Sequence, residues 1–137
     1  MLTSGPILGT LAEMIQSPRA DLRGIYDRTQ MEEVQRQWSR SALSGWKLEA
    51  FRTVAASGRF ASKVTTPYAI GSVHDFMHAK MTVADDTVFV GSYNLSHSGE
   101  MNAENILEIE SAPLADLCVG YIEKIMAKYG AASPGAR

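Results

Sequence analysis

Two strand-like stretches that lie close together in the sequence, residues 77–83 and 87–91, constrain the fold most. Both are rich in apolar and β-branched residues, and Asp85 and Asp86 stand between them. Two strands joined by so short a polar connection pair as an antiparallel hairpin, because a parallel pair needs a long crossover. The sequence therefore predicts a hairpin with its turn at the two aspartates.

The residues that follow the hairpin predict one more strand and a long helix. The strand is expected at residues 105–109. Pro113 then stands where a first-turn proline belongs, apolar residues repeat at helical spacing, and Gly130 ends the pattern. The carboxyl-terminal helix should thus run from Pro113 to Gly130.

The amino-terminal half predicts a helix, a short strand and a second helix. The first helix is expected at residues 6–16, and the apolar run at residues 22–26 is the strand. Asp27 and Gln30 have the spacing of a capping box, which marks the start of a helix. Its expected apolar stripe comprises Met31, Val34 and Trp38.

Mixed strands and helices predict the α/β class, as a layered mixed sheet flanked by helices. Two more strand-like pieces, residues 48–54 and 67–70, are expected to flank a loop at residues 56–63. A chain of 137 residues fits one domain. Because the first helix begins almost at once, we expect a preceding strand to be missing, so that residues 1–137 form one amino-terminally truncated domain.

Composition narrows the classes of protein. The chain is 45% hydrophobic and 20% charged, and no apolar run approaches the roughly 20 residues that cross a bilayer. The start has no signal-peptide pattern, so we expect no membrane span and a cytoplasmic location. Residues 1–68 carry nine basic and six acidic side chains, and residues 69–137 carry four and nine. This charge distribution does not favour tight nonspecific DNA binding.

The histidines of "HDFMHAKMTVADD" permit two interpretations. His74 to His78 gives H-D-x-x-H, close to the H-E-x-x-H zinc signature, which needs both histidines on one face of a helix. The surrounding residues are β-leaning, and on a strand the two rings would lie about 13 Å apart. The sequence therefore does not favour a metal site.

The second interpretation begins at His78. His78 and Lys80 are two apart, so on a strand both side chains project from one face. Ser92 and Asn94 repeat this spacing at the end of the return strand, and Glu104 precedes the third strand. The polar groups of neighbouring strands are thus expected to converge.

This arrangement resembles the phospholipase D superfamily, whose H-x-K-x-x-x-x-D motif is followed by G-S-x-N and by a carboxylate near a second Asn. The matching positions in "HAKMTVADDTVFVGSYNLSHSGEMNAEN" are His78, Lys80, Asp85, Gly91, Ser92, Asn94 and Glu104. The ordered elements downstream make the match specific. The resemblance implies a phospholipase D-like fold, and it is confined in detail to residues 67–110.

The resemblance also implies catalytic roles. His78, as neutral imidazole, would attack phosphorus and form a phosphohistidine. Lys80 and Asn94 would hold the nonbridging oxygens, and Ser92 would add a hydroxyl. Glu104 would accept a hydrogen bond from His78 and orient its ring.

Three further residues are expected to have supporting roles in this site. Asp85, at the strand end, is expected to act as a structural anchor rather than a base. Asp86 takes the same part if the turn register slips by one. His97 follows the GSYN stretch and is expected to line the substrate cleft.

The family joins two such motifs, and the second histidine protonates the leaving oxygen. This chain has one motif, so the second comes from a homodimer partner or from a missing amino-terminal half. No metal or other cofactor is expected. The substrate is left open between phospholipid and nucleic-acid phosphodiesters, as is hydrolysis or transfer. The alternative is a noncatalytic module that binds phosphate compounds or nucleic acid and retains the fold.

Overall fold

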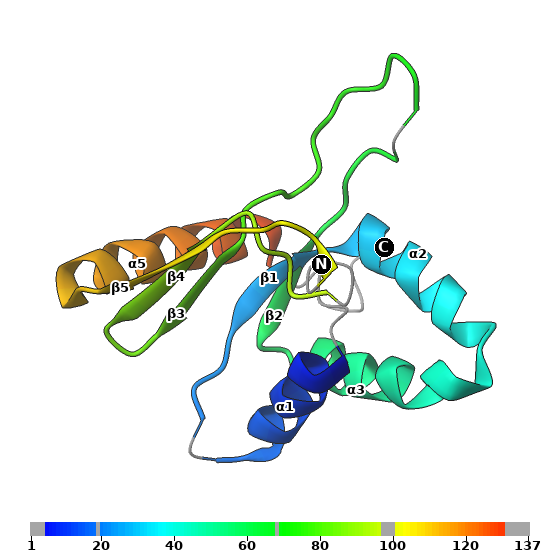
Figure 1. Ribbon diagram of the computed structural model, residues 1–137, viewed down its shortest axis with the longest axis horizontal. Helices are drawn as coiled ribbons and strands as arrows, with labels where there is room; N and C mark the ends of the chain where they lie inside the picture. The colour runs from blue at the N-terminus through cyan, green and yellow to red at the C-terminus, as the bar shows by residue number, and fades with distance from the viewer. Residues whose placement is uncertain (1–4, 19, 68, 97–100, 131–137) are drawn as a thin grey trace.

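The computed structural model describes residues 5–18, 20–67, 69–96 and 101–130 (Figure 1). The helices are α1 (Gly5–Gln16), α2 (Arg28–Ser39), the short 3₁₀ helix η1 (Ala42–Ser44), α3 (Gly45–Ala56) and α5 (Ala112–Tyr129). The strands are β1 (Gly24–Asp27), β2 (Phe60–Lys63), β3 (Met81–Ala84), β4 (Thr87–Gly91) and β5 (Ile106–Glu110). None of the helices in these ranges is long and apolar enough to cross a membrane.

The described strands form two small sheets. β1 and β2 pair in parallel, with Ile25 opposite Ala61. β3, β4 and β5 form an antiparallel sheet in that order. The class is therefore α/β, as expected, but the strands are divided between two sheets where one mixed sheet was predicted.

The main hydrophobic core lies between the first three helices and the parallel sheet. Its buried side chains are Leu8, Ala12, Met31, Trp38, Phe51 and Val54. Tyr26 of β1 adds an edge-to-face contact with Phe51, with ring centroids 5.3 Å apart. α1 packs on α3, and α2 contacts α3 and both parallel strands. Burial of this apolar surface is the chief stabilising term for the amino-terminal half.

The predicted starts of the second helix and of the carboxyl-terminal helix are confirmed by capping bonds. The Asp27 carboxylate accepts a hydrogen bond from the Gln30 amide at 3.0 Å and so caps α2. The Ser111 hydroxyl accepts from the Leu114 amide at 3.4 Å and caps α5. α5 then packs against strands of both sheets, and Figure 1 shows it lying along the antiparallel sheet.

The expected strands between the second helix and the hairpin are wrong. Residues 48–54 belong to α3, because Leu48, Phe51 and Val54 recur at the three-residue spacing of a helix and pack into the core. β2 falls inside the predicted loop at residues 56–63, and the described residues of 67–70 form no strand. Four residues with one buried side chain, Ala61, give too weak a pattern to be recognised as a strand.

The predicted hairpin is confirmed, with a shorter first strand. Met81 pairs with Val90, and the chain turns at Asp85 and Asp86. Residues 77–80, which were predicted to be strand, precede β3 and are irregular. One reason is that the Met77 amide donates to Asp27 at 3.0 Å instead of to a neighbouring strand.

Between β2 and β3 the chain runs outward beyond both sheets and returns (Figure 1). We call residues 69–76 the projecting segment. Ile70 is fully exposed, and Val73 is 74% exposed. The projecting segment has no helix or strand, and at its end Asp75 accepts hydrogen bonds from the Lys63 ammonium and the Thr66 amide.

Candidate active site

The GSYN stretch and the residues before β5 form a compact hydrogen-bonded unit. The Ser92 amide donates to both the backbone and side-chain oxygens of Asn105, each at 3.0 Å. The Asn105 amide donates to the Ser92 hydroxyl at 3.1 Å, and that hydroxyl donates to Glu104 at 2.5 Å. Gly91 permits this packing, since a Cβ at that position would overlap the Asn105 backbone.

Lys80 lies at the same end of the antiparallel sheet. It directly precedes Met81, whose partner Val90 is followed by Gly91 and Ser92. Partial burial lowers the pKa of the Lys80 ammonium, and the negative charge of Glu104 opposes this effect. The structure thus brings together Lys80, Ser92 and Glu104, which we call the Lys80 cluster.

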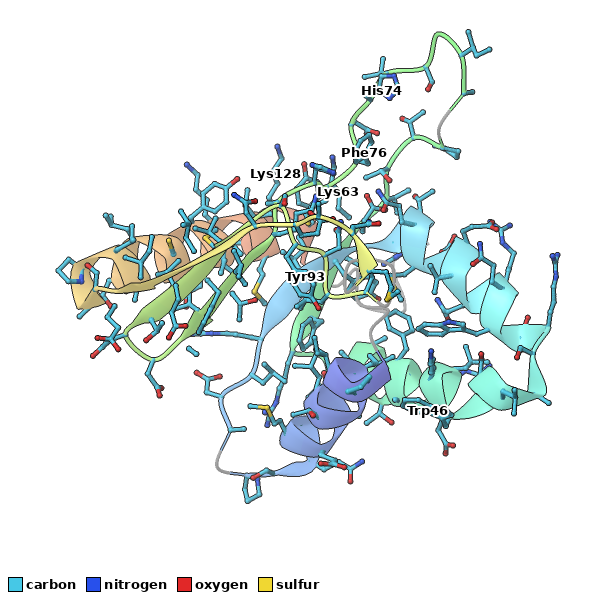
Figure 2. All side chains as sticks on the ribbon, viewed as in Figure 1. Trp46, Lys63, His74, Phe76, Tyr93 and Lys128 are labelled. Atoms are coloured by element: carbon cyan, nitrogen blue, oxygen red, sulfur yellow. The ribbon has the colours of Figure 1, made fainter. Side chains whose placement is uncertain are left out.

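His78 lies two residues before Lys80 and is exposed. The Lys80 ammonium donates to the His78 carbonyl at 2.7 Å, which ties the two residues together through the backbone. The His78 ring meets Phe76 edge-on, with centroids 5.4 Å apart, and Phe76 meets His74 in the same way. Figure 2 shows Phe76 nearer the base of the projecting segment than His74. The imidazole of His78 is therefore open to an incoming molecule.

The expected bond between Glu104 and His78 is absent among the described residues. Glu104 accepts from Ser92 instead. Hydrogen bonds that serve catalysis are often long or unformed in a ligand-free enzyme, so the orienting role of Glu104 stays a prediction.

The two aspartates of the hairpin lie at the opposite end of β3 from Lys80. Asp85 has a φ of 51°, a left-handed conformation that aspartate tolerates better than most residues. The Asp86 carbonyl accepts from the Ser111 amide at 2.9 Å. Four strand residues separate Lys80 from Asp85, which corresponds to about 16 Å. The geometry thus gives Asp85 a place in the turn, away from the Lys80 cluster.

Two further predicted site residues follow β4. Asn94 is partly buried in the loop, and its carbonyl accepts from the Ser96 amide at 2.6 Å. The contacts of the Asn94 side chain with a substrate stay a prediction. His97 lies outside the described residues.

The comparison with protein families gives a match over most of the chain. The family described as "Cardiolipin synthase, PLD-like domain" matches residues 10–126. The chain belongs to the phospholipase D superfamily. Neither a curated protein nor a solved structure matches it. Membership in the phospholipase D superfamily places the chain among phosphodiesterases and their relatives, and the matched region includes every residue of the Lys80 cluster.

The structure also bears on the zinc interpretation of the two histidines. His74 and His78 lie on an irregular segment, where a zinc site of this type requires a helix. Across the described ranges, no group of three or more His, Cys, Asp or Glu side chains is arranged to hold a metal ion. The H-D-x-x-H spacing thus occurs here without the helix that a zinc site of this type requires.

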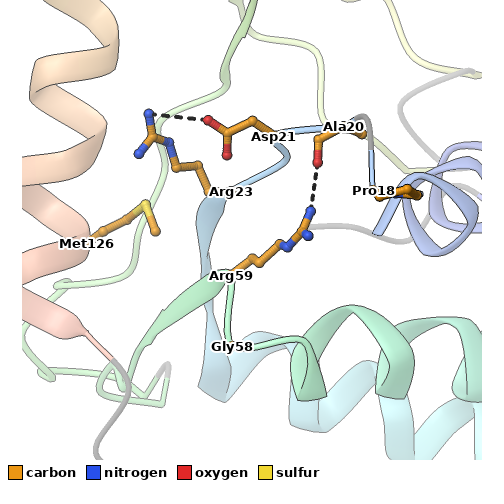
Figure 3. A pocket seen from close by; sticks show the side chains of 7 residues that line it. All are labelled: Pro18, Ala20, Asp21, Arg23, Gly58, Arg59 and Met126. Carbon is orange, nitrogen blue, oxygen red and sulfur yellow. Dashed lines mark hydrogen bonds and ion pairs between the residues drawn. The ribbon is translucent and has the colours of Figure 1, made fainter. Parts of the chain in front are cut away.

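A hollow on the surface lies away from these residues, where β1 and β2 begin (Figure 3). It contains two arginines, each with a partner inside the chain. Arg59 donates to the Ala20 carbonyl at 2.7 Å, and Arg23 lies 2.9 Å from Glu123 and 3.7 Å from Asp21. Because the guanidinium groups are already paired, this hollow is a poorer candidate for an anion site than the Lys80 cluster.

The sequence interpretation missed the contacts that two residues make with each other and with the segment before His78. Asp27 was interpreted only as a helix cap, and Thr65 had no expected role. The Thr65 hydroxyl lies 2.9 Å from each carboxylate oxygen of Asp27, and Asp27 also accepts from the Met77 amide. No sequence pattern signals a contact between residues 38 and 50 positions apart.

Proposed function

We propose that the chain supplies one half of a metal-independent phosphodiesterase that acts through a phosphohistidine. The observation that carries the proposal is the Lys80 cluster, which lies at the end of the antiparallel sheet within two residues of the exposed His78. A cation, a hydroxyl, a carboxylate and an accessible imidazole are the groups that transfer of a phosphoryl group to nitrogen requires.

In the proposed reaction, a nitrogen of His78 attacks phosphorus and the bond to the leaving alkoxide breaks. Lys80 and Asn94 stabilise the negative charge on the nonbridging oxygens. Water then attacks the phosphohistidine, the nitrogen–phosphorus bond breaks, and His78 is regenerated. If an alcohol replaces water in this step, the same intermediate gives transfer instead of hydrolysis.

The leaving alkoxide needs a proton, and this chain has no second motif to supply it. Lys80 is a poor donor for this purpose, because it must remain charged to hold the phosphoryl oxygens. We therefore infer that a second histidine comes from another copy of the chain or from a companion half. Two exposed apolar residues of β5, Ile106 and Leu107, show that the antiparallel sheet leaves surface uncovered within the described ranges.

The proposed substrate is a phospholipid or nucleic-acid phosphodiester. The reacting group is the same in both, and the charge distribution favours neither strongly. Residues 69–137 contain nine acidic side chains against four basic ones, which weakens the case for extended contacts with a nucleic-acid backbone.

The first experiment measures release of nitrophenolate from bis(p-nitrophenyl) phosphate in excess EDTA, over a range of protein concentrations. Wild-type specific activity should rise with concentration if a second copy completes the site. His78→Ala should reduce activity by on the order of a thousandfold or more. The matched control is His74→Ala, which removes an equally exposed histidine four residues away and should retain wild-type activity.

The second experiment tests the intermediate. A radiolabelled phosphodiester mixed with wild-type protein and quenched in alkali should leave label on the protein, because a phosphorus–nitrogen bond survives alkali and is cleaved by acid. His78→Ala should trap none. Equal activity of wild type and His78→Ala would reject the mechanism. Absence of turnover together with undiminished phosphodiester binding by His78→Ala would favour a noncatalytic binding module.

A further inference from the structure

One buried carboxylate joins three distant parts of the chain. Asp27 ends β1 and is 5% exposed. One of its oxygens accepts from the Gln30 amide, and the other accepts from the Met77 amide at 3.0 Å. The Thr65 hydroxyl lies 2.9 Å from both oxygens and donates between them. Asp27 therefore connects α2, the chain after β2 and the chain before β3.

The bond to Met77 matters because Met77 directly precedes His78. Consecutive Cα atoms are about 3.8 Å apart, so a fixed Met77 amide restricts where the His78 backbone can lie. Residues 77–80 form no strand and have no ladder of hydrogen bonds to hold them. Asp27, which belongs to the parallel sheet, restrains this segment in the way that pairing with a neighbouring strand otherwise would.

Other hydrogen bonds, close to the one between Met77 and Asp27, hold the base of the projecting segment together. The Thr66 amide donates to the Asp75 carboxylate at 2.7 Å, and this bond lowers the pKa of Asp75. The Lys63 ammonium donates to the Asp75 carbonyl. Thr29 and Thr65 also exchange two hydrogen bonds, of 2.8 and 2.9 Å. The outgoing and returning limbs are thus tied to each other and to the start of α2.

Helix capping alone does not account for these contacts. A cap needs one side-chain oxygen for an amide of the first turn, and the Asp27–Gln30 bond meets that need. A buried charged carboxylate is costly to desolvate unless hydrogen bonds compensate it. Asn and Ser cap helices comparably without that cost, but each has a single side-chain oxygen and lacks a second acceptor for Met77 and Thr65.

We propose that Asp27 is a positioning residue for the reaction of His78: its second oxygen and Thr65 hold the Met77 peptide and so keep His78 in place next to Lys80, whose ammonium donates to the His78 carbonyl. Asp27 does not touch the substrate, since it is buried and its oxygens already accept from protein donors. The proposal rests on the function proposed above for His78 and adds a residue from outside the matching motif.

The test compares Asp27→Asn with wild type. Asn fills the same volume and still caps α2 through its oxygen, but the amide nitrogen that replaces the second oxygen can accept from neither Met77 nor Thr65. The variant should lose about tenfold or more in kcat with little change in KM, because substrate contacts are retained while the nucleophile is misplaced. Its thermal unfolding should stay cooperative. Asp21→Asn, which alters an exposed carboxylate, is the matched control.

Thr65 gives a second and milder variant. Thr65→Val removes the hydroxyl at nearly constant shape and should lower kcat in the same direction. Thr65→Ser restores the hydroxyl and should restore kcat. A purely structural role predicts the opposite pattern, in which the unfolding midpoint falls while kcat of the folded protein is unchanged.

Amide hydrogen exchange measures the restraint without relying on turnover. Peptides that cover residues 74–80 should exchange faster in Asp27→Asn than in wild type, while the first turn of α2 retains its protection. Unchanged exchange at residues 74–80, or kcat within about twofold of an active wild type, would overturn the proposal. An inactive wild type would exclude completion of the site by a second copy and require a companion half, and the exchange comparison would still decide whether Asp27 holds this segment.

Discussion

The helical amino-terminal half and the antiparallel carboxyl-terminal half differ in how much of their apolar surface they bury. Among the described residues, every fully buried apolar side chain except Val88 and Ala115 lies before residue 62. In the second region Ile106, Leu107 and Leu117 are more than half exposed. The residues proposed for chemistry belong to this second region or lead into it. We therefore expect most substitutions in the core of the first region to affect stability, and substitutions at the proposed site to affect turnover.

The largest expected effect on stability is in the first region. Phe51→Ala should lower the free energy of unfolding by about 3–5 kcal/mol, because it removes a 3%-exposed aromatic ring and its contact with Tyr26. Urea unfolding followed by circular dichroism measures this loss. Leu107→Ala in β5 is the comparison and should cost no more than about 0.5 kcal/mol. Similar losses in the two variants would remove the distinction between the regions.

The next effect concerns turnover in the second region. Lys80→Met should reduce kcat by on the order of a hundredfold or more, because the phosphoryl oxygens lose their nearest cation, while the urea midpoint changes little. Steady-state hydrolysis of the chromogenic phosphodiester checks this. Lys124→Met changes an exposed lysine of α5 and should behave as wild type. Retention of activity in Lys80→Met would show that the cluster does not bind the reacting phosphate.

A smaller effect should appear in the dependence of activity on pH. Burial lowers the pKa of Lys80 and Glu104 raises it, so wild-type activity should decline at alkaline pH before an ordinary lysine would lose its proton. Glu104→Gln keeps an acceptor for Ser92 and removes the negative charge. The pKa of Lys80 should then fall further, and the alkaline limb of the kcat profile should move to lower pH. An unmoved alkaline limb would contradict electrostatic coupling between the two residues.

The lowered pKa of Lys80 also determines how the free energy of unfolding depends on pH. Because the folded-state pKa of Lys80 lies below its unfolded value, the unfolded chain binds more protons in the interval between the two. The contribution of Lys80 to stability therefore increases as pH rises through that interval. Lys80→Met should remove this alkaline increment, which urea unfolding at several pH values would detect.

The smallest effect is expected at the projecting segment. Ile70→Ser changes a fully exposed side chain, so it should alter the free energy of unfolding by less than about 0.5 kcal/mol. Its kcat on the chromogenic substrate should equal that of wild type, because the ends of the segment are held by other residues. A loss of stability comparable to that of Phe51→Ala would mean that the segment packs against something not evident from its exposure.

Much of the fold was predictable where a local pattern was strong. The hairpin turn at Asp85 and Asp86, the Asp27–Gln30 cap and the helix that begins near Pro113 depend on neighbours in sequence. α3 was mistaken for a strand because β-branched and aromatic residues occur among its helically spaced apolar positions. β2 has four residues and depends on pairing with β1, which no local pattern records.

The site was predictable in its residue types and only partly in its geometry. The spacing of His78 and Lys80 suggested a shared strand face, yet both precede β3, and a hydrogen bond from the lysine to the His78 carbonyl connects them instead. The close approach of Asn105 to Gly91, which fixes Ser92, depends on packing between strands. The contribution of Asp27 involves a residue 50 positions away and could emerge only from the tertiary structure.

The bond between Thr66 and Asp75 closes the intervening residues into a loop whose ends are fixed independently of its tip. The entropic cost of closing such a loop grows only slowly with its length. Insertions, deletions and substitutions at the tip should consequently be tolerated by the fold and leave the position of His78 unaltered. The sequence of this loop can therefore vary without displacing the proposed nucleophile that follows it.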